Sequence, residues 1–447
     1  MERFISEKLL SWKSKSKHKP LLITGVRQCG KTYSIKQFGQ REFASLAYLN
    51  LEKERTAADV FSYDFNVKRI ISELSSIVLE QPIIPGQTLL VLDEIQACPQ
   101  AITALKYFCE DMPELHVAAA GSLLGVALKA QQVSFPVGKV ERCAMYPLSF
   151  AEFVCACGHH VLLDGLQRYS LDKEWPGAYT SKLTTLLKQY YIIGGMPEAV
   201  QTWIDSGDYR QIDELQQAIL NDYAHDFAKH PPLIEVPRIR LIWDSIPAQL
   251  AKENSKFIFS HVKKGARAKN LEDALEWLAD AGLIYKLALV SHPELPLAGM
   301  ADNSYFKAYM ADVGLLRQKA GVHYRTILSG DDNYIRFKGA LAENFVLTQL
   351  KAMGIDSWFW RNDASAEVGF ITDCEGWLTP LEVKAADNTK AKSLRLFCQR
   401  YSPRQAVKLS LRNAGVNLEN GTKVWSLPLY AIHRLKECIS AASADGE

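Results

Sequence analysis

The chain of 447 residues has no long apolar run. No stretch of about 18 uninterrupted apolar residues occurs, which predicts that no segment spans a membrane. The first 19 residues are polar, carry several lysines and lack the apolar core of a signal peptide. We therefore expect a cytoplasmic protein that has no membrane partner.

A strong excess of charge and a regular cysteine pattern are also lacking. The net charge is only +2, so a nucleic-acid site would have to be a local patch. Nine cysteines, an odd count without an export signal, indicate reduced thiols. Cys155, Cys157, His159 and His160 lie close together, but they lack a second ligand pair at zinc spacing. Incidental thiols are therefore favoured over a metal site.

What the chain does have is a phosphate-binding loop near its start. Leu21, Leu22 and Ile23 form a short apolar run of the buried-strand type, and the next eight residues fit G-x-x-x-x-G-K-[ST]. Glycines let such a loop curl so that its N–H groups point at phosphate oxygens, and a following helix aims its positive end at the same anion. The predicted nucleotide contacts are Gly25, Val26, Arg27, Gln28, Cys29, Gly30, Lys31, Thr32 and Tyr33.

Two residues at the end of this loop carry the chemistry. Lys31 is expected to reach the β- and γ-phosphates and to act in catalysis, and Thr32 to hold Mg²⁺ through its hydroxyl. We expect the helix that they open to run from about 31 to 39. A chance match to the pattern is disfavoured because a strand precedes it and a helix follows it.

A second acidic motif follows at one-domain distance. The apolar strand 88–92 ends in Asp93 and Glu94, which is the Walker B pattern. Asp93 is predicted to bind Mg²⁺, and Glu94 to polarise the attacking water as general base. The alternative is a strand-end acidic pair that only faces solvent.

The alternation of strands and helices predicts the fold class. Strands are expected at 21–23, 45–51, 88–92, 115–120 and 139–145, with helices between them. This order implies an α/β, three-layer P-loop fold with a parallel sheet, whose ligand lies at the carboxyl ends of the strands. Ser122, at the tip of the fourth strand, is a candidate γ-phosphate sensor, and a plain turn is the alternative.

At this point the chain resembles a known family. The stretches that carry the resemblance are GVRQCGKT (25–32), LLVLDEIQ (89–96), AAGSLLGVAL (119–128), SFPVGKVE (134–141), YPLSFAEF (146–153), IGGMPEAV (193–200), IPAQLAKENSKF (246–257), FKAYMADVGLL (306–316), AEVGF (366–370) and PLEVKA (380–385). They are similar to prokaryotic AAA-class P-loop ATPases that carry a C-terminal region of largely unknown function. The resemblance implies ATP and Mg²⁺ as ligands. It also implies a homo-oligomer, because such ATPases commonly form rings, and an unidentified protein partner.

The sequence suggests three domains: an ATPase domain with a helical extension (1–200), a helical and winged-helix-like domain (201–330) and a restriction-endonuclease-like domain (331–447). In the second, helices 237–251 and 270–281 precede a hairpin whose turn spans 292–299. Four cations before the second helix are candidate DNA contacts, and a solvated face is the alternative. They are Lys263, Lys264, Arg267 and Lys269.

The third domain resembles restriction endonucleases through a helix with Glu343, a strand with Glu367, and Glu382-Val383-Lys384. Residues two apart on a strand share a face, so Glu382 and Lys384 are expected to face one pocket. Active members of that fold hold Mg²⁺ or Mn²⁺ with Asp and Glu while the Lys positions water. A buried ion pair is the alternative.

The chain departs from that pattern at Gly369. The usual motif is Glu-Val-Asp-Phe, and here Gly369 replaces the central metal-binding Asp. Glu367 lies on the same strand face, but about 7 Å away at a rise of about 3.3 Å per residue. Losing a hard oxygen ligand weakens Mg²⁺ binding, so we expect an inactive or impaired nuclease-like site.

The sequence therefore predicts an ATPase that couples hydrolysis to its C-terminal regions and acts on DNA. The alternative is a nucleotide-controlled protein-interaction switch without nucleic-acid activity. Arg27, Lys139 and Arg142 are all candidates for a γ-phosphate sensor or a trans-acting finger, and the sequence leaves the choice between them open.

Overall fold

The computed structural model describes residues 1, 3–122, 135–227, 235–252, 256–265, 267–330, 335–362, 366–385 and 391–444. Three of the stretches that carry the family resemblance, 119–128, 134–141 and 246–257, extend in part beyond the described residues. No helix in the described ranges is both long enough and apolar enough to cross a membrane.

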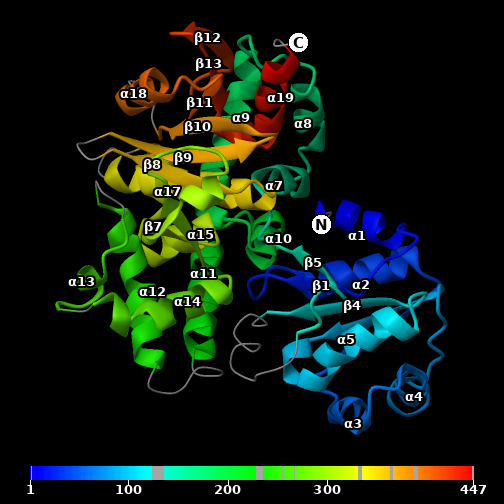
Figure 1. The fold of residues 1–447 in the computed structure, drawn as a ribbon. Coiled ribbons are helices and arrows are strands. Elements are labelled where there is room, and N and C mark those ends of the chain that lie inside the picture. Colours follow the sequence, from blue (N-terminus) through cyan, green and yellow to red (C-terminus); the bar gives the residue numbers. More distant parts are fainter. Residues whose placement is uncertain are drawn as a thin grey trace. The chain divides into compact units, whose positions relative to one another are not determined.

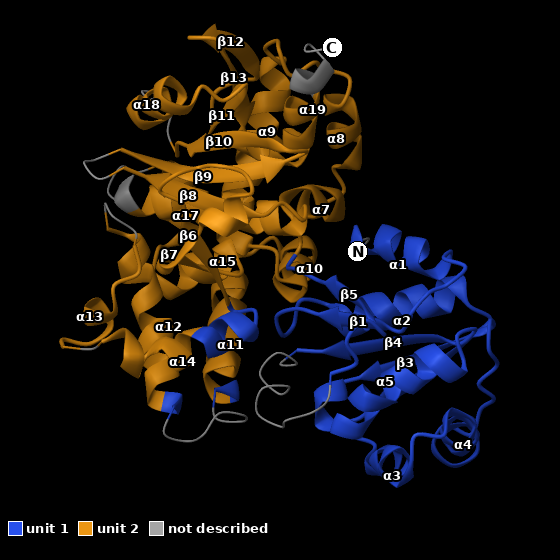
Figure 2. Cartoon of the chain, in the orientation of Figure 1, with its two compact units in different colours: residues 1–147, 226–236, 276–283 blue, residues 148–225, 237–275, 284–447 orange. Residues whose placement is uncertain are grey.

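The chain forms two compact units, which are coloured separately in Figure 2. The first contains residues 1–147, 226–236 and 276–283, and the second contains 148–225, 237–275 and 284–447. Neither unit is a single continuous stretch of chain. The three-domain division suggested by the sequence therefore stays a proposal, and each unit is described by itself.

The first unit is built around a parallel sheet of five strands (Figure 1). Its strands are β1 (Leu21–Thr24), β2 (Ser45–Asn50), β3 (Thr88–Asp93), β4 (His116–Gly121) and β5 (Glu141–Ala144), in the order β2-β3-β4-β1-β5. Its helices are α1 (Ile5–Lys13), α2 (Lys31–Glu42), α3 (Arg55–Tyr63), α4 (Val67–Glu73), which continues into a π-helical turn (Leu74–Val78), and α5 (Pro99–Asp111). This is the predicted α/β P-loop architecture.

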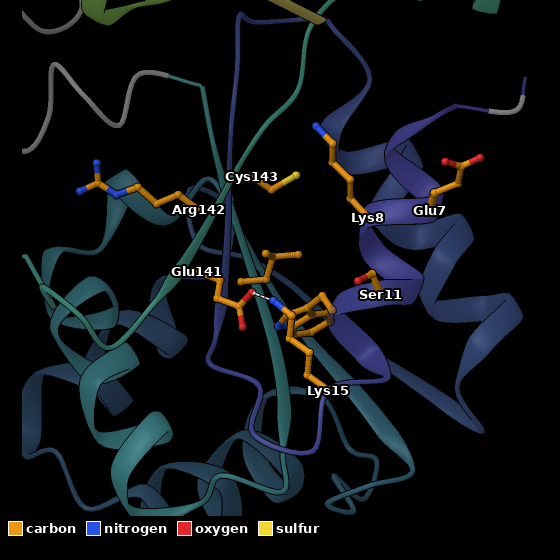
Figure 3. Close-up of a pocket in the computed structure, with 9 residues that line it drawn as sticks. Glu7, Lys8, Ser11, Lys15, Glu141, Arg142 and Cys143 are labelled. Carbon is orange, nitrogen blue, oxygen red and sulfur yellow. Dashed lines mark hydrogen bonds and ion pairs between the residues drawn. The ribbon is translucent and has the colours of Figure 1, made fainter. Parts of the chain in front are cut away.

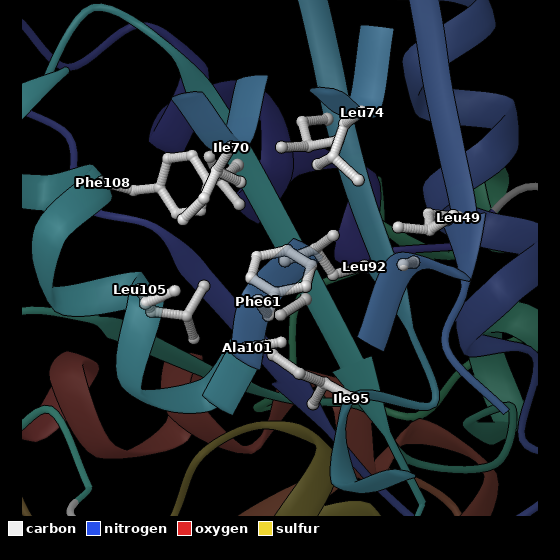
Figure 4. Close-up of a cluster of buried hydrophobic side chains, with 14 of the residues drawn as sticks. Leu49, Phe61, Ile70, Leu74, Leu92, Ile95, Ala101, Leu105 and Phe108 are labelled. Atoms are coloured by element: carbon white, nitrogen blue, oxygen red, sulfur yellow. The ribbon is translucent and has the colours of Figure 1, made fainter. Parts of the chain in front are cut away.

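Alternate residues of β3 bury opposite faces of this sheet. Leu90 and Leu92 belong to a core cluster that includes side chains of α3, α4 and α5, as Figure 4 shows for Phe61, Ile70 and Phe108. The other face meets α2, where a Cβ at Gly39 would touch Leu46 and Leu89. Full burial of each such Leu contributes about 1.5–3 kcal/mol. The helices on both faces thus hold the sheet that carries the loop motifs.

The strand order places the two motifs close together. Thr24, Asp93 and Gly121 are the last residues of β1, β3 and β4, which are neighbouring strands. Thr24 pairs with Gly121, and β3 pairs with β4 in parallel. The carboxyl ends of these strands therefore form one edge, where an α/β sheet binds its ligand.

The second unit contains a mixed sheet of eight strands, ordered β12-β13-β11-β10-β9-β8-β6-β7. These strands are β6 (Ile284–Leu289), β7 (Asp302–Met310), β8 (Ser357–Arg361), β9 (Glu367–Cys374), β10 (Trp377–Val383), β11 (Gln405–Ser410), β12 (Gly415–Glu419) and β13 (Thr422–Pro428). The hairpin β6–β7 joins the C-terminal strands through the pairing of Leu289 with Phe359. The hairpin that the sequence assigned to a winged helix is therefore part of the C-terminal sheet, and a winged helix is not confirmed.

The second unit also contains helices, some of which pack on this sheet. They are α7 (Phe150–Ala156), α8 (His160–Leu166), α9 (Gly177–Ile193), α10 (Pro197–Ser206), α11 (Tyr209–Asp226), α12 (Val236–Leu250), α13 (Phe259–Val262), α15 (Val313–Lys319), α16 (Tyr324–Ser329), α17 (Ile335–Ala352), α18 (Lys392–Tyr401) and α19 (Leu435–Ala444). The boundary between the units runs through α14 (Glu272–Asp280). Asp226, the last residue of α11, also belongs to the first unit.

A glycine pair in the second unit interlocks with a buried carboxylate. The Asp312 side chain accepts hydrogen bonds from the backbone N–H groups of Gly195 and Leu315, at 2.6 and 2.9 Å. Burial raises the pKa of Asp312 to about 6, against the opposing effect of these bonds. Gly194 has φ +73°, and a Cβ there would overlap the carboxylate. This contact explains Gly194, whereas a Cβ at Gly195 would overlap the carbonyl oxygen of Leu148.

The same region holds a buried arginine. Arg317 of α15 donates to Asp213 at 2.7 Å and to the side-chain oxygen of Gln216 at 2.6 Å. It also reaches the backbone oxygens of Ile192 and Val322, each at 3.2 Å. One guanidinium therefore ties α15 to both α9 and α11.

Candidate functional site

The phosphate-binding loop has the backbone that its glycines were predicted to allow. It joins β1 to α2, and Gly30, the N-cap of α2, has the left-handed φ of +95°. Gly25 has φ +153°, and a Cβ there would overlap the carbonyl oxygen of Met145. Larger residues at either position would strain or displace the loop.

Lys31 lies inside this loop. Its side chain is buried, and its ammonium donates to the backbone oxygens of Gly25 and Val26, both at 2.9 Å. The positive charge therefore lies against the loop that is predicted to surround the phosphates.

Thr32 and Asp93 meet directly. The Thr32 hydroxyl donates to Asp93 Oδ2 at 2.7 Å, although 61 positions separate the two residues. Asp93 is only 3% exposed. Both groups are hard oxygen ligands of the kind that Mg²⁺ prefers, so this pair fits the predicted metal.

Sequence reasoning missed Tyr48. It lies on β2, and its hydroxyl donates to the same Asp93 Oδ2 at 2.7 Å. Burial, then the hydrogen bond and charge of Asp93, raise the pKa of Tyr48 to about 12, so the hydroxyl keeps its proton. No motif marks this residue, because only the pairing of β2 with β3 brings it to the site.

Glu94 has an unusual backbone. Its φ is +50°, which is uncommon outside glycine and carries a strain that active sites often hold. The Gln96 amide, two residues on, donates to Glu94 Oε2 at 2.5 Å and fixes its direction. Gln96 is a second neighbour that the sequence did not identify.

The remaining nucleotide candidates lie around the loop. Ser122 is buried and follows β4 directly, next to the end of β1. Arg27 pairs with Asp226, and a Cβ at Gly282 would come within 3.4 Å of the Val26 nitrogen. Residues from the middle of the chain thus contact the loop. Arg3, near the start of the chain, also contacts the loop and donates a hydrogen bond to Cys29 O at 3.0 Å.

Lys139 and Arg142 lie elsewhere. Lys139 pairs with Glu110 at 2.8 Å, and the guanidinium of Arg142 stacks 4.3 Å from the ring centre of Phe135. Arg142 pairs with Leu22, near the amino end of β1, whereas the phosphate-binding loop follows its carboxyl end. Neither residue is therefore placed to sense a phosphate in its own loop.

The C-terminal candidates gather around an unexpected lysine. Lys307 of β7 is completely buried, and its ammonium lies 2.6 Å from Glu367 Oε1 and 3.5 Å from Glu343 Oε2. Burial alone would lower the pKa of Lys307, but the two carboxylates outweigh it and raise the pKa. The Tyr309 hydroxyl donates to the same Glu343 oxygen at 2.5 Å.

Glu382 and Lys384 form the other half of this acidic site. They pair at 2.7 Å, and Glu382 is almost fully buried. Burial raises the pKa of Glu382, Lys384 opposes this, and the charge of Glu343 also acts on it. Of the alternative ion pairing among Glu343, Glu382 and Lys384, the contact between Glu382 and Lys384 is present, whereas Glu343 contacts Lys307.

The comparisons with known proteins bear on the amino-terminal site. Residues 17–154 match the family model of an AAA domain. Below, this matched segment of the chain is called the AAA domain. Two further models, each of a domain of unknown function, match residues 184–326 (DUF8612) and 338–430 (DUF4143). No curated protein is found to be significantly similar in sequence.

Several solved structures share features with the chain. A Walker-type ATPase of Pyrococcus abyssi is 15% identical, with 70% of this chain and 94% of that one covered, at a TM-score of 0.45. The ORC2 protein of Aeropyrum pernix is 13% identical, with 72% and 91% covered, at 0.35. DnaA of Aquifex aeolicus is 12% identical, with 62% and 86% covered, at 0.27. Because these TM-scores are low, the family model and the strand order carry the assignment.

The four basic DNA candidates lie outside the AAA domain. Lys263 and Lys264 follow α13, and Arg267 and Lys269 lie at a short 3₁₀ turn before α14. All four are exposed, and none forms an ion pair within the described ranges. The structure therefore presents them to solvent as a group.

The first unit also has a hollow of about 380 Å³ between α1 and β5 (Figure 3). Lys8 and Ser11 line it from α1, and Lys15 crosses it to pair with Glu141 at 2.5 Å. Leu21 and Glu141 are the first residues of β1 and β5. The hollow therefore lies at the opposite strand ends from the phosphate-binding loop and contains none of the predicted nucleotide contacts.

Proposed function

We propose that this protein binds ATP at the phosphate-binding loop of its AAA domain and hydrolyses it with Mg²⁺. The observation that carries the proposal is the convergence of four side chains at one sheet edge. Lys31 lies in the loop, Thr32 bonds to Asp93, and Glu94 follows directly, held by Gln96. A positive charge for phosphate, two hard oxygen ligands and a base are the parts that this reaction needs.

Each group has a defined task in this proposal. The N–H groups of the loop and the Lys31 ammonium bind the phosphates, and Thr32 and Asp93 would hold the metal. Bound Mg²⁺ supplies charge neutralisation at the phosphate oxygens. Glu94 accepts a proton from the attacking water, and the Gln96 contact keeps its carboxylate oriented. Ser122 contacts the γ-phosphate, and Tyr33, exposed at the start of α2, contacts the nucleotide.

We propose that ATP binding changes the contacts that Arg27 makes outside the loop. This residue lies inside the loop and pairs with Asp226, the last residue of α11. A bound phosphate competes for the same guanidinium, because both partners are anions. Loss of that pair would weaken the contact between the loop and the end of α11.

The test of nucleotide binding is Lys31→Ala. Removing a charge-assisted hydrogen bond to phosphate costs about 1.5–3 kcal/mol, which corresponds to about 10- to 100-fold weaker binding. The measurement is titration of a fluorescent ATP analogue in Mg²⁺ buffer. Lys106→Ala, which removes an exposed lysine of α5, is the matched control. Equal affinity of both variants would refute the assignment of the loop.

A second proposed function is DNA binding, favoured by the exposed basic group at 263–269. Replacing Lys263, Lys264, Arg267 and Lys269 by Gln should weaken binding and reduce the slope of log K against log salt by up to about 0.9 per contact. The measurement is fluorescence anisotropy of a labelled DNA duplex at several salt concentrations between about 50 and 200 mM.

The control for this experiment carries Gln at four exposed lysines that are far apart in sequence: Lys68, Lys106, Lys182 and Lys392. Equal loss in both proteins would show that only total charge matters. If no DNA binds at the lowest salt, with or without ATP, the alternative becomes the ATP-controlled protein-interaction switch, tested by ATP-dependent assembly of the chain.

A further inference from the structure

The acidic site of the second unit has the oxygen donors of a divalent-cation site but already contains a cation. Glu343 comes from α17, Glu367 from β9 and Glu382 from β10. Carboxylates are the donors that Mg²⁺ and Mn²⁺ prefer, but no three acids in the described part of the chain are grouped closely enough to hold a metal ion. The restriction-endonuclease resemblance implies such a metal, so its fit to these residues can be tested.

Two observations show that the residues do not fit it. First, the Lys307 ammonium contacts Glu367 at 2.6 Å and Glu343 at 3.5 Å. A metal ion between these carboxylates would meet the positive charge of a fully buried ammonium. Second, the strand position facing Glu343 is Gly369, which offers no ligand.

The space at Gly369 is nevertheless open. Among the described residues and apart from its chain neighbours, the only atom within 4 Å of a Cβ placed there is Glu343 Oε1, at 3.8 Å. This is an ordinary van der Waals distance, so a side chain can be added at residue 369 without moving its surroundings. A carboxylate at this position would point at Glu343 and complete the set of acids.

Several contacts fix the position of Lys307 beside the carboxylates. It lies on β7 beside the ring of Phe359, with its ammonium 5.1 Å from the ring centre. Tyr309, two residues on and thus on the same strand face, donates to Glu343. The Asn344 side chain of α17 bonds to both the N–H and the carbonyl oxygen of Met310, at 2.8 and 3.1 Å. These contacts fix β7, and with it the ammonium, against α17.

We infer that the ammonium of Lys307 takes the place of the divalent cation in this acidic site. The site as it exists binds no Mg²⁺ or Mn²⁺ and has no metal-dependent nuclease activity. The lysine instead joins β7 to α17 and β9, and so fastens the hairpin β6–β7 to the C-terminal sheet. This inference rests on the acidic site alone and is independent of ATP hydrolysis by the AAA domain.

The test counts bound Mn²⁺ by electron paramagnetic resonance on the full chain without nucleotide. All proteins carry Asp93→Asn, so that the AAA domain contributes no ion through Asp93. With Lys307 present, we expect the chains with and without Glu382→Gln to bind the same amount of Mn²⁺ at metal concentrations up to the millimolar range. With Lys307→Met and Gly369→Asp together, we expect one Mn²⁺ per chain, lost again when Glu382→Gln is added.

Two results would overturn the inference. One is Mn²⁺ bound while Lys307 is present and lost on Glu343→Gln or Glu382→Gln. The other is a folded Lys307→Met, Gly369→Asp chain that binds no Mn²⁺. If that variant fails to fold, the two chains that keep Lys307, with and without Glu382→Gln, decide the matter. Mn²⁺ that is bound without the substitution and lost with it refutes the inference, and equal Mn²⁺ binding supports it. Failure of ATP binding would leave these outcomes unchanged.

Discussion

A Glu94→Gln protein is expected to bind ATP about as tightly as the parent chain and to hydrolyse it about 10²–10⁴ times more slowly. The amide keeps the size and the hydrogen-bonding capacity of the side chain but cannot accept the proton of water. Gln96 donates to the Glu94 side chain at 2.5 Å, and an amide oxygen can accept the same bond. The lost rate should therefore reflect the missing base and not a displaced side chain.

The measurement is single-turnover release of phosphate at saturating ATP, together with equilibrium binding of the nucleotide. Glu114→Gln, an exposed glutamate just before β4, is the matched control and should keep full activity. If Glu94→Gln retains the parent rate, another group activates the water, and the assignment of the base is wrong. If it loses binding as well, Glu94 serves the structure of the site.

The second large effect is expected for Arg317→Met, which should lower the free energy of unfolding by about 3–5 kcal/mol. The guanidinium is 1% exposed and pairs with Asp213, whose side chain is 25% exposed. Removing it strands that carboxylate and leaves Gln216 and the Ile192 oxygen without their donor. Met fills a similar volume, so the loss is electrostatic and not a cavity.

Lys319→Met is the matched control on the same helix. Lys319 pairs with Asp244 at 2.7 Å, but that carboxylate is 71% exposed, and an exposed pair contributes only about 0–1 kcal/mol. Urea unfolding followed by circular dichroism measures both variants. A cost for Arg317→Met no greater than that for Lys319→Met would show that the buried network contributes little to stability.

The sequence predicted those parts of the AAA domain that depend on short local motifs. The buried strands, the glycine loop and the acid at the end of β3 each follow from neighbouring residues, and their order implies the parallel sheet. Helix α3 was missed because its apolar positions are few, and the helices that they pack against, α4 and α5, come later in the chain. Residues 64–80, whose apolar spacing is helical, contain α4 followed by a π-helical turn.

Contacts between distant residues could not be predicted in this way. Tyr48 and Gln96 have no signature of their own, and they act only through Asp93 and Glu94. Lys307 is the clearest case. It lies 60 positions before Glu367, in a segment that the sequence assigned to another domain. Only the pairing of β6 with β8 brings that segment beside the acidic strands.

The discontinuity of the first unit has a consequence for how the protein is made. Asp226 and Gly282, which contact the phosphate-binding loop, come from beyond residue 200, and Phe227 packs edge-on against Trp277 with ring centres 5.5 Å apart. A ribosome must therefore synthesise the chain through residue 283 before the first unit is complete. In an amino-terminal fragment that ends earlier, Arg27 would lack the Asp226 carboxylate. In the full chain, the first unit can finish folding only after its later segments have been synthesised.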